Sequence, residues 1–118
     1  MIYEQMELKT DYNRAQNVED IFSNKEIDCI FICLPNSFNR PYSIKALQSG
    51  KHVFCEKPPC FTAQEVLEIK DAELASGKKL MYGFNHRHHE SIIHMKKLID
   101  AGDHGKILWM RGRYGKSV

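Results

Sequence analysis

The sequence predicts an α/β fold, a doubly wound parallel sheet of which only part is present. Short runs rich in β-branched and aromatic residues alternate with longer amphipathic stretches, and each intervening stretch is long enough for a right-handed crossover helix. The run Asp28–Leu34 is apolar after its first residue, which is typical of a strand buried on both faces of a parallel sheet. The sheet is expected to be incomplete, because no Gly-x-Gly-x-x-Gly phosphate loop occurs in the 118 residues.

Three neighbouring parallel strands are expected, in chain order. They are Asp28–Leu34, Lys51–Cys55 and Lys79–Phe84. Two consecutive prolines after Lys57 prevent the second strand from continuing, because proline has no backbone N–H to donate. The segments that follow the three strands are Pro35–Ser37, Glu56–Pro58 and Asn85–Arg87. Because parallel strands point the same way, we expect these segments to converge on one edge of the sheet.

Helices are expected around the strands, and most have recognisable ends. Asn17 is placed to cap the first helix, and Thr62 with Glu65 has the form of a capping box. Glycine follows each of the last three helices. The expected helices are Asn17–Phe22, Pro41–Ser49, Thr62–Ser76 and Glu90–Ala101. Partial alternation over Ile107–Tyr114 predicts a half-exposed strand.

Composition excludes several classes of protein. The 17 Lys and Arg against 15 Asp and Glu give 17 − 15 = +2, too balanced for a nucleic-acid or anionic-membrane binder. No apolar run approaches the ~20 residues of a membrane helix, and the N-terminus has no signal-peptide core. The cysteines are expected to be reduced, buried residues of a soluble cytoplasmic protein. They are Cys29, Cys33, Cys55 and Cys60.

Lys57 is the strongest catalytic candidate. A lysine held between a strand end and two prolines has little backbone freedom, so its ammonium can be aimed at a substrate hydroxyl. Beside a nicotinamide ring it would hydrogen-bond that hydroxyl oxygen and stabilise the alkoxide from which hydride leaves. Glu56 would position the lysine or offset its charge. The alternative is a solvated Glu-Lys pair, and spacing alone leaves both interpretations open.

Longer segments carry a family resemblance. They are Asp28–Asn36, Ala46–Leu47, Gly50–Pro58 and Gly83–Arg87. Together they resemble the glucose–fructose oxidoreductase and inositol dehydrogenase family (Gfo/Idh/MocA), from about Thr10 to Tyr114. The resemblance implies the second half of a Rossmann-type dinucleotide-binding domain over residues 1–105, and the start of a C-terminal sheet domain over 106–118.

The same resemblance implies site residues and chemistry. Lys57 matches the catalytic lysine, and five further positions match residues at the nicotinamide end of NAD or NADP. These are Pro35, Asn36, Glu56, Asn85 and Arg87. The implied reaction is reversible hydride transfer between nicotinamide and a secondary alcohol of a sugar, nucleotide sugar or cyclitol, in a homo-oligomer. The family's turn also favours a cis Lys57–Pro58 bond.

Departures from the family pattern limit this expectation. The glycine-rich turn and the ribose-binding acid are expected before Met1, and the family's catalytic aspartate and histidine beyond Val118. Asn39 stands where relatives often have histidine, and Pro59 is also unusual. We therefore expect this chain alone to be inactive and to bind cofactor weakly or not at all. NAD and NADP both stay open, as does the particular sugar.

Two other interpretations compete. The histidines of the third loop and last helix suggest a metal site, but their spacing is poor for one helical face and brings no carboxylate or cysteine, so we expect none. A non-catalytic, truncated paralogue acting as a folding or interaction module shares every motif above. In either case the Asp28–Leu34 strand is expected to leave an apolar edge that a second copy would cover.

Overall fold

The structure is a computed structural model that describes residues 15–113 and Gly115. Its elements, in chain order, are α1 (Val18–Ser23), β1 (Cys29–Ile32), α2 (Asn36–Gln48), β2 (His52–Cys55), α3 (Ala63–Ser76), β3 (Leu80–Tyr82), the 3₁₀ helix η1 (Asn85–His88) and α4 (Glu90–Ala101). The chain divides after Gly83 into two compact units. None of the helices seen within the described residues is both long and apolar enough to span a membrane.

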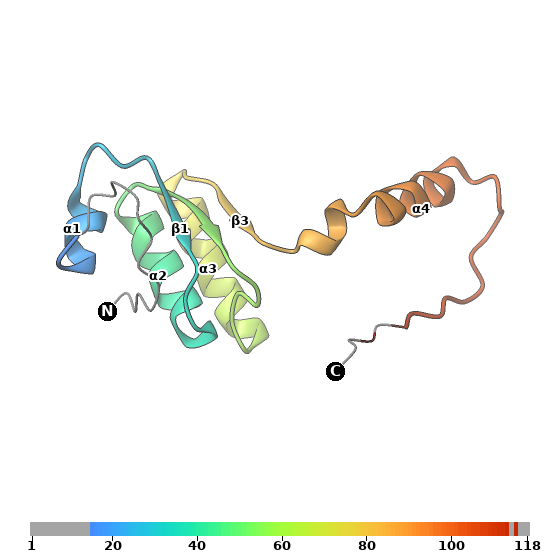
Figure 1. Cartoon of the computed structure of the whole chain (residues 1–118), viewed down its shortest axis with the longest axis horizontal. Helices are drawn as coiled ribbons and strands as arrows, with labels where there is room; N and C mark the ends of the chain where they lie inside the picture. The colour runs from blue at the N-terminus through green and yellow to red at the C-terminus, as the bar shows by residue number, and fades with distance from the viewer. Residues whose placement is uncertain (1–14, 114, 116–118) are drawn as a thin grey trace, which may run out of the picture. The chain divides into compact units, whose positions relative to one another are not determined.

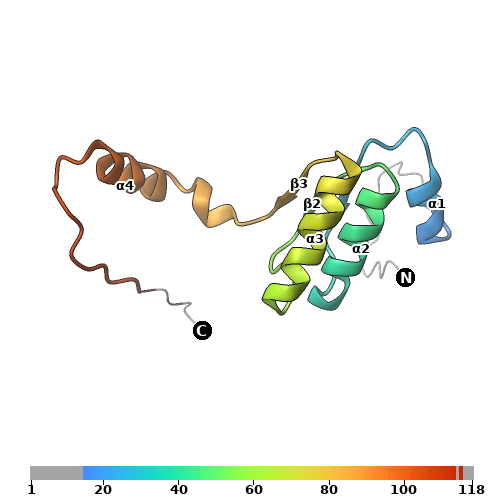
Figure 2. The same ribbon diagram turned by 180° about the vertical axis from the view of Figure 1, so that it is seen from behind.

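The first unit contains a parallel three-stranded sheet in the order β1-β2-β3, as predicted. Ile30 pairs with Val53, which pairs with Leu80, and each following row steps one residue along all three strands. Figures 1 and 2 show α2 and α3 lying side by side on one face of this sheet. The crossovers through α2 and α3 make this half of a doubly wound sheet.

The core lies between the sheet and these helices. Alternate strand residues point toward the helices, because side chains on a strand alternate between its two faces. The buried cluster comprises Phe22, Ile32, Ala46, Leu47, Val53 and Cys55. The remaining row, Phe31–Phe54–Met81, points to the opposite face, where Phe31 is 70% exposed.

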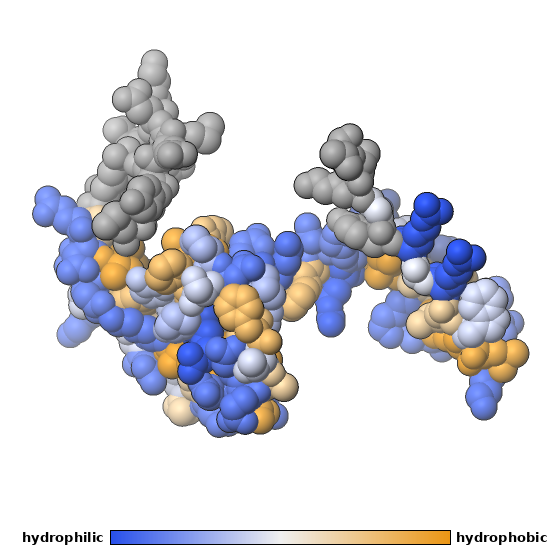
Figure 3. All heavy atoms as spheres, turned by 90° about the horizontal axis from the view of Figure 1, so that it is seen from below, coloured by the Kyte–Doolittle hydropathy of each residue, from blue (hydrophilic) through white to orange (hydrophobic). Residues whose placement is uncertain are grey.

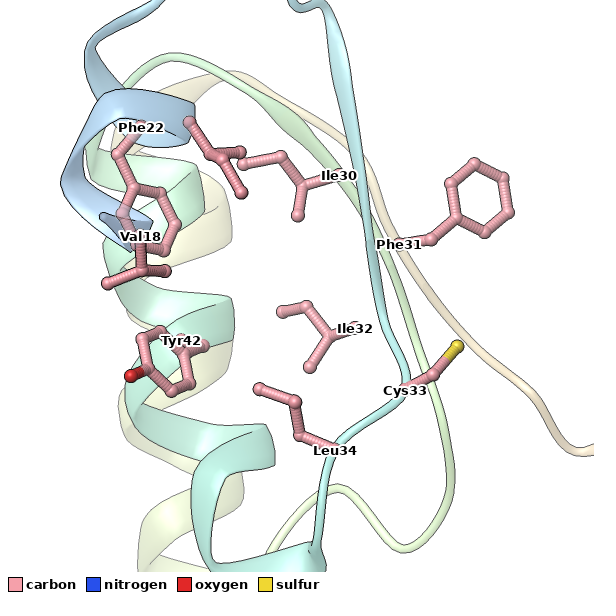
Figure 4. A pocket seen from close by; sticks show the side chains of 9 residues that line it. Val18, Phe22, Ile30, Phe31, Ile32, Cys33, Leu34 and Tyr42 are labelled. Carbon is pink, nitrogen blue, oxygen red and sulfur yellow. The ribbon is translucent and has the colours of Figure 1, made fainter. Parts of the chain in front are cut away.

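The prediction that the first strand is buried on both faces was therefore wrong. No helix of the described first unit covers the Phe31 face, so only the helix-facing half of the apolar run is buried. Figure 4 shows Phe31 and Cys33 pointing away from an apolar hollow of about 200 Å³ that lies between β1 and the helices α1 and α2. The four cysteines are free, as expected, but Cys29 and Cys33 are exposed for the same reason.

The predicted helix ends are largely confirmed. Asn17 caps α1 and Thr62 caps α3, each within a complete capping box. At α3, the Thr62 hydroxyl accepts from the Glu65 amide at 3.2 Å and the Glu65 carboxylate accepts from the Thr62 amide at 3.0 Å. Gly77 ends this helix with φ 65°, a left-handed conformation that costs glycine little.

The predicted start of the second helix was wrong. The helix begins at Asn36 and continues through Pro41, where a loop and a first-turn proline were expected. Its buried residues lie on both sides of the proline: Asn39, Ser43, Ala46 and Leu47. Packing along this face outweighs the one helical hydrogen bond that Pro41 does not donate.

The second unit begins at Phe84 and contains η1 and α4. Gly102 ends α4 with φ 74°, as its position predicted. Residues 107–113 form no strand, so that prediction was wrong for the described part; Tyr114 lies outside it. A strand needs a hydrogen-bonded partner, and this segment has none among the described residues. Figure 3 shows apolar side chains at the surface beside polar ones. In this unit Leu108 and Trp109 are exposed. The domain boundary near residue 105 stays a prediction.

Candidate active site

The first predicted site residues lie where β1 and β2 end. Pro35 is the N-cap of α2 and Asn36 is its first residue, three and four positions beyond the end of β1. Glu56 and Lys57 follow directly on β2. Since β1 and β2 are parallel and paired through Ile32 and Cys55, both segments leave the sheet at its carboxyl edge.

Lys57 lies in a tight turn, and the bond from Lys57 to Pro58 is cis, as predicted. The side chain is exposed. No hydrogen bond or ion pair engages its ammonium within the part of the chain that the structure describes. The ammonium is thus free to meet a ligand; the alternative of a solvated Glu-Lys pair also places it in solvent, so exposure alone does not decide between the two.

Glu56 does not pair with the lysine ammonium. Its carboxylate instead accepts a hydrogen bond from the Lys57 backbone amide at 3.2 Å. It also lies against Gly83 at the end of β3, where a Cβ would come within 3.3 Å of Glu56 Oε2. The absence of a side chain at Gly83 therefore makes room for the carboxylate between the two strand ends.

One buried and one half-buried side chain lie close to this edge, in the last paired row of β2 and β3. Cys55 and Tyr82 are partners in that row. Burial raises the pKa of the Cys55 thiol, and burial raises the pKa of Tyr82 to about 12. Both groups are therefore neutral near pH 7, and neither can supply charge there.

Asn85 and Arg87 belong to η1 in the second unit. Both are exposed, and the Arg87 guanidinium lies over the Phe84 ring at 5.9 Å from its centroid. Their convergence with Lys57 stays a prediction. Within the described residues, no three His, Cys, Asp or Glu side chains are placed to hold a metal ion.

A model of the oxidoreductase family with an NAD-binding Rossmann fold matches residues 3–84. The chain belongs to this family. Inositol 2-dehydrogenase of Salmonella typhimurium is 31% identical over 105 residues, which are 88% of this chain and 30% of that protein. D-glucoside 3-dehydrogenase of Escherichia coli is 35% identical over 80 residues, or 68% of the chain and 23% of that protein.

Solved structures agree with the fold of this chain. The crystal structure of myo-inositol 2-dehydrogenase from Lactobacillus plantarum matches with a TM-score of 0.70 at 35% identity, covering 79% of this chain and 28% of that one. The chain thus spans less than a third of the length of the relatives named here. The family resemblance and the Rossmann-like fold are confirmed; the roles of single residues stay predictions.

Asn39 is a residue to which the sequence alone assigns no role. It is fully buried in α2, and its side-chain amide donates to the carbonyls of Glu56 and Pro58. These contacts span 17 and 19 residues of sequence, so no local pattern predicts them. The one signal in the sequence is that Asn39 stands where relatives often have histidine.

Proposed function

We propose that this chain is part of an NAD- or NADP-dependent oxidoreductase that transfers hydride to or from a secondary alcohol. The observation that supports this most is the turn after β2. It presents an exposed lysine ammonium, without a partner among the described residues, at the carboxyl edge of a Rossmann-like sheet, the edge where ligands bind in such folds.

The residues present fit only one end of the cofactor. Asn36 and the Lys57 turn offer polar and cationic groups near the edge, as a nicotinamide and its substrate require. The sequence has no glycine-rich loop whose amides and helix N-terminus would hold a pyrophosphate. In the absence of that loop, the chain alone is expected to bind the dinucleotide too weakly for calorimetry at micromolar protein and to be inactive.

When bound, the nicotinamide ring accepts or donates the hydride. In alcohol oxidation, Lys57 in its neutral amine form would accept the hydroxyl proton of the substrate, and the resulting ammonium would stabilise the alkoxide from which hydride leaves. In the direction of carbonyl reduction, the same ammonium would give its proton to that oxygen. Glu56, held against Gly83, fixes the backbone of Lys57 rather than neutralising its side chain.

The substrate class is proposed from the relatives. Their names state activities on inositol and on D-glucosides, which are respectively a cyclitol and sugar derivatives. A sugar, nucleotide sugar or cyclitol with a secondary hydroxyl therefore suits this chain. Its four free cysteines agree with a reducing, cytoplasmic location. A homo-oligomer is proposed because β1 presents an unpaired edge in the described sheet.

A chimera tests the proposal. Residues 15–113 replace the matching segment of Salmonella typhimurium inositol 2-dehydrogenase, and NADH formation is followed with myo-inositol. Lys57→Met should lower kcat by about 10²- to 10⁴-fold, the usual contribution of a positioned acid-base group. NADH fluorescence would establish that both proteins still hold the cofactor.

Lys79→Met is the matched control. Lys79 is also exposed, but it precedes β3 and so lies at the amino edge of the sheet. Its loss should leave kcat unchanged. An active chimera in which Lys57→Met is as fast as Lys79→Met would remove Lys57 from the chemistry and with it the main support for the proposal.

A further inference from the structure

Asn39 connects α2 to the turn that carries Lys57. Its side chain is 0% exposed, and its Nδ2 donates to the Glu56 carbonyl at 3.0 Å and to the Pro58 carbonyl at 2.8 Å. The two accepting residues flank Lys57 on either side. An asparagine amide has two N–H donors, so both can be used at once.

Neither carbonyl lies within a strand, because β2 ends at Cys55. Asn39 therefore ties both of these carbonyls to α2, while the Glu56 amide also donates to the Ile32 carbonyl at 2.9 Å and the Cys55 thiol lies 3.4 Å from the Glu56 carbonyl. On the lysine side, Glu56 adds a second restraint through its carboxylate, which accepts from the Lys57 amide. The ammonium itself has no partner in the described residues, so the hydrogen bonds around Lys57 hold its backbone and fix the point from which its side chain extends.

We propose that Asn39 is a positioning residue, whose amide holds the backbone on both sides of Lys57 and thereby sets the place of its ammonium. The consequence for turnover rests on the proposed function. The positioning itself does not, and it can be measured without cofactor or substrate.

A buried asparagine that only stabilises the core is the competing explanation. Ser43 provides the comparison, because it lies one turn further along α2 and is also 0% exposed, and among the described residues no hydrogen bond joins its side chain to the Glu56–Pro58 backbone. A loss of core stability would act alike for both residues. A loss of positioning would follow from Asn39 alone.

The experiment uses the 118-residue chain labelled with ¹⁵N. In the parent chain, the two Asn39 Nδ2 protons should exchange slowly with water, and the heteronuclear NOE of the Lys57 amide should match that of β2. Asn39→Ala should lower the Lys57 NOE well below the β2 value, whereas Ser43→Ala should leave it unchanged. In the active chimera, Asn39→Ala should lower kcat at least tenfold with little change in NADH binding.

Several outcomes would overturn the proposal. In the parent chain, these are fast exchange of the Asn39 side-chain amide protons or a low NOE at the Lys57 amide. In the variants, they are an unchanged Lys57 NOE in Asn39→Ala, or a Lys57 NOE that Ser43→Ala lowers as much as Asn39→Ala does. The parent measurements stand even if the Asn39 variant does not fold. A chimera that binds NADH but does not oxidise myo-inositol would count against the proposed function. It would leave the positioning result intact, because that result is measured without cofactor or substrate.

Discussion

The small core of the first unit makes Leu47 a sensitive position. Leu47 is 0% exposed in α2 and packs in the buried cluster with Ile32 and Val53. This leucine joins the helix that carries Asn39 to the sheet that carries Lys57. We predict that Leu47→Ala destabilises the chain severely while leaving its backbone contacts intact.

The magnitude follows from complete burial. Truncating a fully buried leucine to alanine costs about 2–5 kcal/mol through lost transfer energy and the cavity left behind. The described residues include only seven buried hydrophobic side chains, so few neighbouring side chains can move into the cavity that the loss of Leu47 leaves. We therefore expect a loss of about 3 kcal/mol or more, a large share of the ~5–15 kcal/mol typical of domains.

Leu74→Ala is the matched control. Leu74 is also near the C-terminal end of a helix, but it is 70% exposed. The same chemical change there should alter the free energy of unfolding by no more than about 0.5 kcal/mol. Urea unfolding followed by far-UV circular dichroism gives both values, provided that the m-value is unchanged. Equal losses at the two positions would show that the core is not where the structure places it.

Three further predictions concern ionisation, reactivity and association. Burial raises the pKa of Tyr82 to about 12 from 10.0, so its contribution to the free energy of unfolding is present below pH 10 and is lost between pH 10 and 12. In urea titrations over this range, Tyr82→Phe should make the free energy of unfolding fall less with pH than in the parent chain. Iodoacetamide followed by mass spectrometry should label exposed Cys29 and Cys33 well before buried Cys55, and equal rates would contradict the burial. In sedimentation experiments the chain should run as a dimer or larger species, and Phe31→Glu should lower the fraction of associated chains, because Phe31 is exposed. A monomer at high concentration that unfolds cooperatively would refute this prediction.

Local chemistry made much of the fold predictable. The capping boxes at Asn17 and Thr62 and the glycine at position 77 act within a few residues, so their effects can be read without knowing the tertiary structure. The parallel order of the three strands followed from the length of the crossovers.

The wrong predictions share one cause, which is dependence on distant neighbours. Whether Phe31 is buried depends on what covers the second face of the sheet. Whether a helix continues through Pro41 depends on packing against β1 and β2. Whether residues 107–113 form a strand depends on a partner strand.

The candidate site divides in the same way. Lys57 and its cis proline were accessible through a short motif and a family resemblance. The Asn39 contacts were not, because two carbonyls 17 and 19 residues away become neighbours only when α2 packs on the sheet. The orientation of Glu56 toward Gly83 likewise needs the pairing of β2 with β3.

The central claim, that the carboxyl edge of this sheet meets a nicotinamide ring, is tested most directly by titrating the ¹⁵N-labelled chain with nicotinamide mononucleotide. Without a glycine-rich loop the affinity should be weak, in the millimolar range. Amide shifts should change at Asn36 and Lys57, at the carboxyl edge, and stay constant at Lys51 and Lys79, at the amino edge. A folded chain that shows no change at Lys57, or changes confined to Lys51 and Lys79, would contradict the account.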